Sequence, residues 1–139
     1  MGSLVDLVDG LDVSEIRTYF LQAERGEYDG SGEARISVSA RNEGGLLEVR
    51  CRLAASTEDC QVVVDRSAVF TLRLRLSIPE AVMGEFVEKV GVMTIYPYLR
   101  EGAFSLASNL GVAPPVMGLL KAGSIRLMPQ SAEESDDIG

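Results

Sequence analysis

Six arginines are the residues of this sequence whose type and spacing most clearly suggest a binding chemistry. They fall on the polar side of segments that alternate between apolar and polar residues, so one face of a sheet is expected to carry them. They are Arg35, Arg41, Arg50, Arg52, Arg73 and Arg75. A face of guanidinium groups can bind phosphates, which would suit a nucleic acid.

Three observations argue against nucleic-acid binding. Glu33, Glu43 and Glu48 are interleaved with the arginines, no aromatic residue is expected on the same face for base stacking, and the formal net charge is −8. The sequence therefore favours a solvated face of mixed charge, and we expect no nucleic-acid partner. A nucleic-acid-associated protein that uses the arginine face stays an alternative.

Patterns of catalytic and metal-binding residues are missing from the sequence. It contains no histidine, no glycine-rich phosphate loop and no serine nucleophile elbow. No pair of carboxylates is better explained by catalysis than by solvation. The two cysteines, Cys51 and Cys60, do not make a disulfide framework, and Cys51 suits the core as a small apolar residue. We therefore expect neither an enzyme nor a cofactor.

Length and charge indicate one globular domain with acidic ends. A chain of 139 residues, 46% of them hydrophobic, is long enough to bury a core. The net negative charge lies in residues 1–15 and 131–139, while the middle of the chain is balanced. No apolar run is long enough to cross a bilayer, and the first residues lack the basic region of a signal peptide. We expect a cytoplasmic protein without membrane insertion.

Four strands are predicted in the first part of the chain. They are expected at residues 15–23, 33–41, 47–55 and 60–78. A bulge or bend is expected near Ser67 in the fourth strand, and Phe20 is expected on the opposite face from Tyr19 in the first. A turn centred near residue 57 would place Cys51 opposite Val64.

A long helix is predicted after the strands. Pro97 suits a first helical turn because it has no N–H group and a fixed φ, so the helix is expected to begin there. Residues 79–90 are weakly helical, and Gly91 is expected to separate this segment from the long helix. One apolar stripe of the helix consists of Ile95, Leu99, Ala103, Leu106 and Leu110. Gly111 is placed to cap the helix, and Pro114 prevents its continuation.

The segment Tyr96-Pro97-Tyr98-Leu99-Arg100-Glu101, followed by Pro114-Pro115, resembles the motif of the SecB family of export chaperones. The order of strands, connecting segment, long helix and prolyl loop also agrees, over roughly residues 15–121. The resemblance implies an α+β fold, a four-stranded antiparallel sheet with a long helix packed on one face. Motif residues that would shape the helix start and a groove wall are Tyr96, Pro97, Tyr98, Arg100, Glu101 and Pro114.

The resemblance also implies an ATP-independent holdase that binds unfolded polypeptides in hydrophobic grooves and assembles as a dimer of dimers, a homotetramer. Some members of the family pass export precursors to SecA, and others guard an antitoxin in toxin-antitoxin systems. Two departures argue against hand-over to SecA: the segment after Pro115 lacks the usual Asn-Phe, and the outward sheet face is rich in arginine instead of acidic. The alternative function is a SecB-fold interaction subunit dedicated to one partner, such as an antitoxin.

An excess of apolar residues at turns and strand ends predicts an oligomer interface or a client groove. The candidate groove residues are Phe20, Val62, Val64, Phe86, Val92, Met93, Met117, Leu119 and Leu120. By residue range, we expect an N-terminal extension over 1–14, a SecB-like domain over 15–128 and a disordered acidic tail over 129–139.

Overall fold

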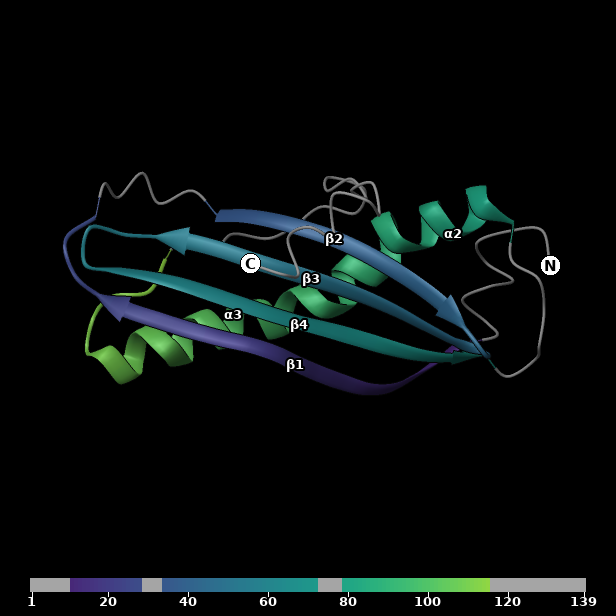
Figure 1. The fold of residues 1–139 in the computed structure, drawn as a ribbon, viewed down its shortest axis with the longest axis horizontal. Coiled ribbons are helices and arrows are strands. Elements are labelled where there is room, and N and C mark those ends of the chain that lie inside the picture. The colour runs from purple at the N-terminus through teal and green to yellow at the C-terminus, as the bar shows by residue number, and fades with distance from the viewer. Residues whose placement is uncertain (1–10, 29–33, 73–78, 116–139) are drawn as a thin grey trace.

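The computed structural model describes residues 11–28, 34–72 and 79–115 of the chain. Its strands are β1 (Leu11–Arg25), β2 (Ala34–Glu43), β3 (Leu46–Ser56) and β4 (Cys60–Leu72). They form one antiparallel sheet in the order β1-β4-β3-β2, so β1 and β2 are its edges (Figure 1). A helical segment follows, made of α2 (Glu80–Phe86), the π-helix η1 (Val87–Gly91) and α3 (Val92–Leu110).

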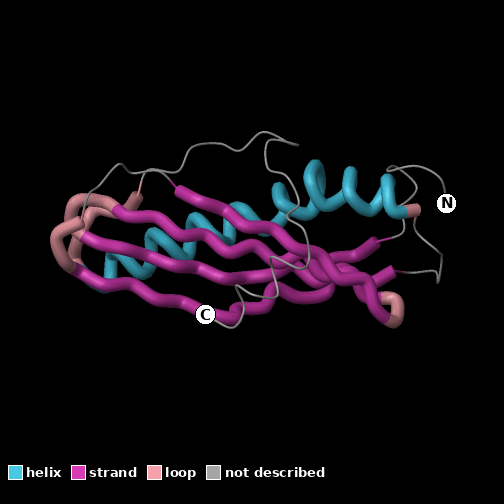
Figure 2. The backbone as a smooth tube through the Cα atoms, turned by 45° about the horizontal axis from the view of Figure 1, so that its top comes forward, coloured by secondary structure: helices cyan, strands magenta, loops and turns pink. Residues whose placement is uncertain are grey.

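The helical segment covers one face of the sheet. In Figure 1 helix α3 runs diagonally behind the strands, and Figure 2 shows the same two layers from a tilted direction. The expected α+β fold, a four-stranded antiparallel sheet with a long helix on one face, is confirmed. We call the face under α3 the inner face. The opposite one, which no helix of the described residues covers, is the outer face.

Turn chemistry fixes how neighbouring strands are joined. Gly44 and Gly45 have φ angles of 59° and 83°, which suit the tight hairpin turn between β2 and β3. At the turn between β3 and β4, Thr57 Oγ1 accepts hydrogen bonds from the N–H groups of Asp59 at 3.2 Å and Cys60 at 3.1 Å. The hydroxyl thereby replaces backbone partners that the turn cannot supply.

The pairing of β3 with β4 differs from the expected register. Cys51 lies opposite Arg66 and not opposite Val64, a shift of two residues along β4. Because side chains alternate along a strand, an even shift leaves each residue on its expected face. Cys60 pairs with Arg25 of β1, and both cysteines are buried as thiols.

The irregularities of the described sheet lie in β1. Its pairing with β4 shifts twice, and the second shift lies between Thr18 and Phe20. The prediction of a bulge or bend near Ser67 is wrong for β4, because its pairing with β3 keeps one register through that residue. The bulge in β1 instead brings Tyr19 and Phe20 to the same face, which corrects the expectation that they lie on opposite faces.

The helix begins well before Pro97. The backbone keeps right-handed helical angles at the junctions of α2, η1 and α3, so one continuous segment runs from Glu80 to Leu110. Pro97 lies inside α3, where a proline typically costs about 3 kcal/mol. Buried residues on both sides of it, from Phe86 to Leu99, stabilise the helix through this point. The predicted start at Pro97 and the interruption at Gly91 are therefore both wrong.

Two glycines let the helix lie close to the sheet. A Cβ atom at Gly91 would lie 2.7 Å from Val49 Cγ2, and one at Gly102 would lie 2.9 Å from Val64 Cγ1. Both distances are shorter than side chains tolerate. The glycine at residue 91 is therefore explained by contact with β3, within a helix that continues.

The C-terminal end of α3 follows the prediction. Gly111 adopts a φ of 73°, and the N–H group of Val112 donates to the carbonyl of Ala107, which closes the last turn. Arg25 of β1 donates from Nη1 to the carbonyl of Leu110 at 3.4 Å. The sheet thus also contributes to satisfying the exposed carbonyls at the helix end.

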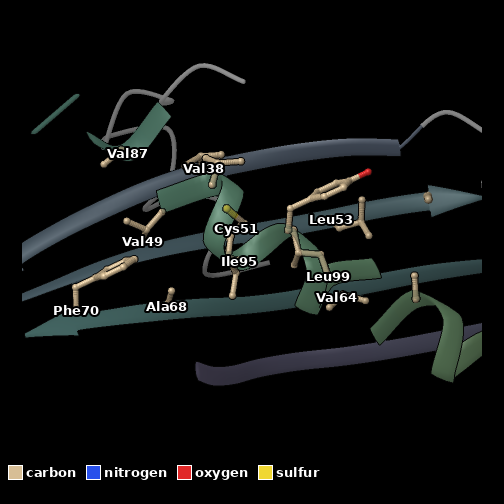
Figure 3. Packing of buried hydrophobic residues seen from close by; sticks show 14 of the residues in the cluster. Val38, Val49, Cys51, Leu53, Val64, Ala68, Phe70, Val87, Ile95 and Leu99 are labelled. Atoms are coloured by element: carbon tan, nitrogen blue, oxygen red, sulfur yellow. The ribbon is translucent and has the colours of Figure 1, made fainter. Parts of the chain in front are cut away.

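The core fills the space between the helix and the inner face (Figure 3). Ile95, Leu99 and Ala103 of the predicted stripe are fully buried, and Leu106 and Leu110 pack at its margin, so the stripe is confirmed. Facing residues from the sheet are Val38, Val49, Cys51, Leu53, Val64, Ala68 and Phe70. At one end of the core the rings of Phe70 and Phe86 meet edge to face with centroids 5.0 Å apart.

Replacing Gly102 by alanine is expected to lower the free energy of unfolding by roughly 1–3 kcal/mol, the usual cost of overpacking a core. The added methyl group would overlap the short, buried side chain of Val64, which has no room to move aside. Gly84→Ala is the control, because a Cβ at Gly84 meets no atom within 4 Å and alanine favours a helix by about 1 kcal/mol. Urea titration measures both variants. A Gly102→Ala protein as stable as the control would contradict the close contact.

Candidate functional site

The solvent side of α3 carries a row of residues that we call the outer stripe, made of Met93, Pro97, Arg100 and Phe104. Spacings of three and four residues place them on one side of the helix. Met93 and Phe104 are large apolar groups, yet they are 36% and 43% exposed. Beside the stripe lies an open depression of about 530 Å³, lined by Pro97, Arg100, Glu101, Phe104, Ser105 and Ser108. This surface can bury an apolar group of another chain.

The six motif residues are divided between core and surface. Tyr96 lies in the core with 9% exposure, whereas the ring of Tyr98, at 44%, is open to solvent. Pro97 is exposed on α3, and Pro114 is exposed in the segment that follows the helix.

Arg66 of β4 joins the motif to the sheet. Its Nη1 donates to the carbonyl of Tyr98 at 2.7 Å and to Glu101 Oε2 at 3.1 Å, and its Nε donates to Thr18 Oγ1 at 3.1 Å. Glu101 is thus bonded to a strand residue. The neighbouring Arg100 has a buried Nε that finds no hydrogen-bond partner among the described residues. Sequence reasoning missed Arg66, although a charged residue at an inward position of β4 was its signal.

The structure separates the predicted groove residues. Val62, Val64, Phe86 and Val92 are at most 1% exposed and belong to the core between helix and sheet. Met93 lies on the outer stripe, and Phe20 lies on the outer face of the sheet with 41% exposure. The remaining three, Met117, Leu119 and Leu120, lie outside the described residues.

Strand β1 is a long edge strand with apolar side chains in solvent. It has 15 residues, and within the described part of the chain it pairs only with β4. Val13, Tyr19, Phe20 and Leu21 are each between 41% and 52% exposed. An unpaired edge with apolar side chains is typical of a surface that another polypeptide covers.

A buried carboxylate organises one part of the outer face. Glu48 accepts hydrogen bonds from the hydroxyls of Tyr19 and Ser67, the latter at 2.6 Å, and Arg41 donates to it at 3.1 Å. Arg17 Nη1 lies 3.7 Å from Glu48 Oε2 and forms an ion pair with it. Burial raises the pKa of Glu48, but the hydrogen bonds from Ser67 and Tyr19 and the charges of both arginines outweigh burial, so the pKa lies below its ordinary value.

A second buried carboxylate lies on the same face, further along the strands. Asp65 is 1% exposed and accepts two hydrogen bonds from Arg50, at 2.9 and 2.8 Å, with Arg52 at 3.5 Å. The predicted outer face of mixed charge is therefore present. Glu48 and Asp65 are buried beneath arginines, whereas the side chain of Glu43 is 79% exposed. Two of the six predicted arginines, Arg73 and Arg75, lie outside the described residues.

The aromatic residues of the outer face correct one sequence argument. Tyr19 and Phe20 stand among the arginines, so the expectation of no outward aromatic residue is wrong. In the described ranges, no helix is long and apolar enough to span a membrane, and no three His, Cys, Asp or Glu residues gather as they would around a metal ion.

Comparison of the sequence with known proteins identifies one relative that aligns with nearly the whole chain. No family model matches the chain. It is 33% identical over 132 residues to the SecB-like chaperone SmegB of Mycolicibacterium smegmatis, which covers 95% of this chain and 90% of the relative.

Two solved structures are similar in fold. One is the Mycobacterium tuberculosis SecB-like chaperone Rv1957 in complex with a ChAD peptide from the antitoxin HigA1. It has a TM-score of 0.69 and 17% identity, over 84% of this chain and 94% of that one. The other, a protein of unknown function from Streptococcus agalactiae, has a TM-score of 0.58 and 5% identity, over 79% of this chain and 97% of that one.

Acid is expected to destabilise the protein partly through Glu48. Because its pKa in the folded protein lies below the ordinary value of 4.5, Glu48 contributes stability above that pH and loses the contribution as the pH falls through the folded value. Glu48→Gln is expected to lower the free energy of unfolding at pH 7 by about 1–3 kcal/mol and to flatten its decline below about pH 4.5.

The control is Glu43→Gln, whose side chain is 79% exposed and whose loss is expected to change stability little. Urea titrations between about pH 3 and pH 7 measure both variants. An unaltered pH dependence in Glu48→Gln would show that the buried network does not hold this carboxylate charged.

Proposed function

This chain belongs to the family of SecB-like chaperones, and we propose that it binds non-native polypeptides on exposed apolar surface without using ATP. The observation that carries the proposal is a folded protomer with eight large hydrophobic side chains at 36–52% exposure in its described residues. Seven of them lie on the edge strand β1 and on α3, and the eighth, Leu46, begins β3. Non-native chains expose apolar side chains and unpaired backbone groups, and such a surface offers both kinds of contact.

The residues predicted to line a client groove stay a prediction. Met93 is exposed on the outer stripe of the protomer and is open to a client wherever a second copy does not cover it. Val62, Val64, Phe86 and Val92 would meet one only if the helix left the sheet.

Dedication to one partner is the alternative, favoured by one specific observation. The similar Mycobacterium tuberculosis chaperone was solved with an antitoxin peptide bound. A chain of the present fold can use the same apolar surface for one extended segment of an antitoxin. General holding and dedicated binding differ in the number of unrelated polypeptides that are bound. The argument against hand-over to SecA, the cytoplasmic location and the absence of enzymatic activity stay predictions from the sequence.

Self-association is a further part of the proposal. The outer stripe has the spacing with which one helix packs against another, and the small residues Ser105 and Ser108 beside it allow close approach. We expect Phe104 of one copy to enter the depression beside the stripe of a second copy. With edge-to-edge pairing of sheets, this contact would give the dimer of dimers expected from the sequence.

The purified chain is expected to suppress the aggregation of two unrelated denatured proteins, without ATP, at near-stoichiometric concentration. Light scattering by the denatured proteins during dilution from urea measures this. Suppression for neither protein, by a sample that is folded, would contradict general holding and leave the dedicated alternative. Titration of a labelled antitoxin-derived peptide with the chain, followed by fluorescence anisotropy, tests that alternative.

Phe104→Asp is expected to lower the molar mass measured by light scattering to a smaller multiple of 15.0 kDa. The reason is that a charge would have to be buried where two helices meet. Asn109→Asp introduces the same charge at an exposed position of α3 outside the depression, and its mass is expected not to change. An equal mass for Phe104→Asp and the unaltered chain would show that copies do not meet through the outer stripe.

A further inference from the structure

The outer face of the sheet carries a ledge of two aromatic rings. Thr18 pairs with Arg66, which reaches inward to α3, whereas Phe20 pairs with Asp65, whose carboxylate is bonded to outer-face arginines. The bulge between these pairs therefore brings Tyr19 and Phe20 to the outer face together, 42% and 41% exposed. Exposed neighbouring aromatic residues are enriched in contact surfaces.

Guanidinium groups surround this aromatic ledge. The guanidinium carbon Cζ of Arg50 lies 4.0 Å from the centroid of the Tyr19 ring. That of Arg52 lies 5.4 Å from the centroid of the Phe20 ring. The side chain of Asp65 beneath them is only 1% exposed, whereas those of Arg50 and Arg52 are 23% and 36% exposed. The centre of the outer face thus presents positive and aromatic groups to solvent, although the whole chain has a net charge of −8.

Arg52 has hydrogen-bonding capacity left. Arg50 already satisfies Asp65 with bonds of 2.9 and 2.8 Å, while Arg52 reaches the same carboxylate only from Nη1 at 3.5 Å. A guanidinium group has five N–H donors, so several of those on Arg52 are open to a ligand. The small residue Ser37 of β2 lies opposite Arg52. The exposed Arg35, two residues before Ser37, lies on the same face of that strand.

From this juxtaposition we propose that the outer face binds an extended acidic polypeptide segment in which a carboxylate stands next to an aromatic or other apolar side chain. Arg52 binds the carboxylate through its open N–H groups, and Arg35 lies within the same face for a second one. The apolar side chain packs on the ledge of Tyr19 and Phe20. The site lies across the sheet from α3 and shares Tyr19 and Phe20 with the surface proposed to hold non-native chains, and its arginines extend it beyond that proposal.

Charge decides between the possible occupants. A nucleic acid could also use arginines and aromatic rings, but a polyanion would be repelled by the acidic ends and net charge of this chain along its length. A short acidic segment carries few charges and can place each of them at a guanidinium group. The outer face therefore fits a peptide better than a polynucleotide.

The test uses the full chain and a fluorescein-labelled peptide of about ten residues in which glutamate alternates with phenylalanine, followed by fluorescence anisotropy at about 0.1 M salt. Arg52→Gln is expected to weaken binding roughly tenfold, the effect of losing a hydrogen-bonded charge. Asp65 keeps both bonds to Arg50 in this variant, so the fold is expected to persist. Lys89→Gln removes one positive charge from the helical segment and is the control. Phe20→Ser is a second variant and is expected to weaken binding severalfold.

Several outcomes would overturn the proposal. They are unchanged affinity in both Arg52→Gln and Phe20→Ser, equal binding of a peptide with lysine in place of glutamate, and tighter binding of an oligothymidylate of similar length. A lower molar mass for Arg52→Gln would instead identify the outer face as a contact between copies. Suppression of aggregation by Arg52→Gln is expected to equal that of the unaltered chain, so this proposal and the holdase proposal fail separately.

Discussion

Close contact between the helix backbone and the sheet is the constraint on which the other features depend. At Gly91 and Gly102 there is no room for a side chain between the helix and the valines of β3 and β4. This proximity seals the core residues of both layers and brings Arg66 within reach of the carbonyl of Tyr98. Because the helix covers only one face of the sheet, its own solvent side and the outer face of the strands stay exposed in the protomer.

The two faces of the sheet bury different kinds of side chain. On the inner face, apolar side chains pack against α3 in the manner of any two-layer domain. On the outer face no described helix supplies a cover, and Glu48 and Asp65 are instead sealed by arginines and tyrosine from neighbouring strands. Each carboxylate has several hydrogen-bond partners, which is the condition under which buried charge is tolerated. Beneath its aromatic and positive surface, the outer face therefore holds two buried, hydrogen-bonded carboxylates.

Local pattern predicted much of this fold, and long-range pairing explains where it failed. Alternation in β2 and β3, the stripe from Ile95 to Leu110 and the cap at Gly111 follow from sequence spacing alone. The bulge beside Phe20 does not, because a bulge is defined against the partner strand and β1 alone alternates plausibly in either arrangement. The helix start was wrongly predicted at Pro97, because the preference of proline for a first turn is outweighed by the packing of the residues before it. Val64 was assigned to a groove because apolarity alone cannot separate a core position from a binding surface.

The π-helix η1 has a consequence for comparing this chain with its relatives. Val87 and Val92 are both buried although they are five residues apart, a spacing that would separate them by about 140° around an α-helix. The wider π turn brings them to the same side. Such a turn absorbs one surplus residue while leaving Phe86 against Phe70 on one side and Ile95 in the core on the other. A homologue shorter by one residue can thus keep both sets of contacts, and the gap in its alignment belongs within Val87–Gly91.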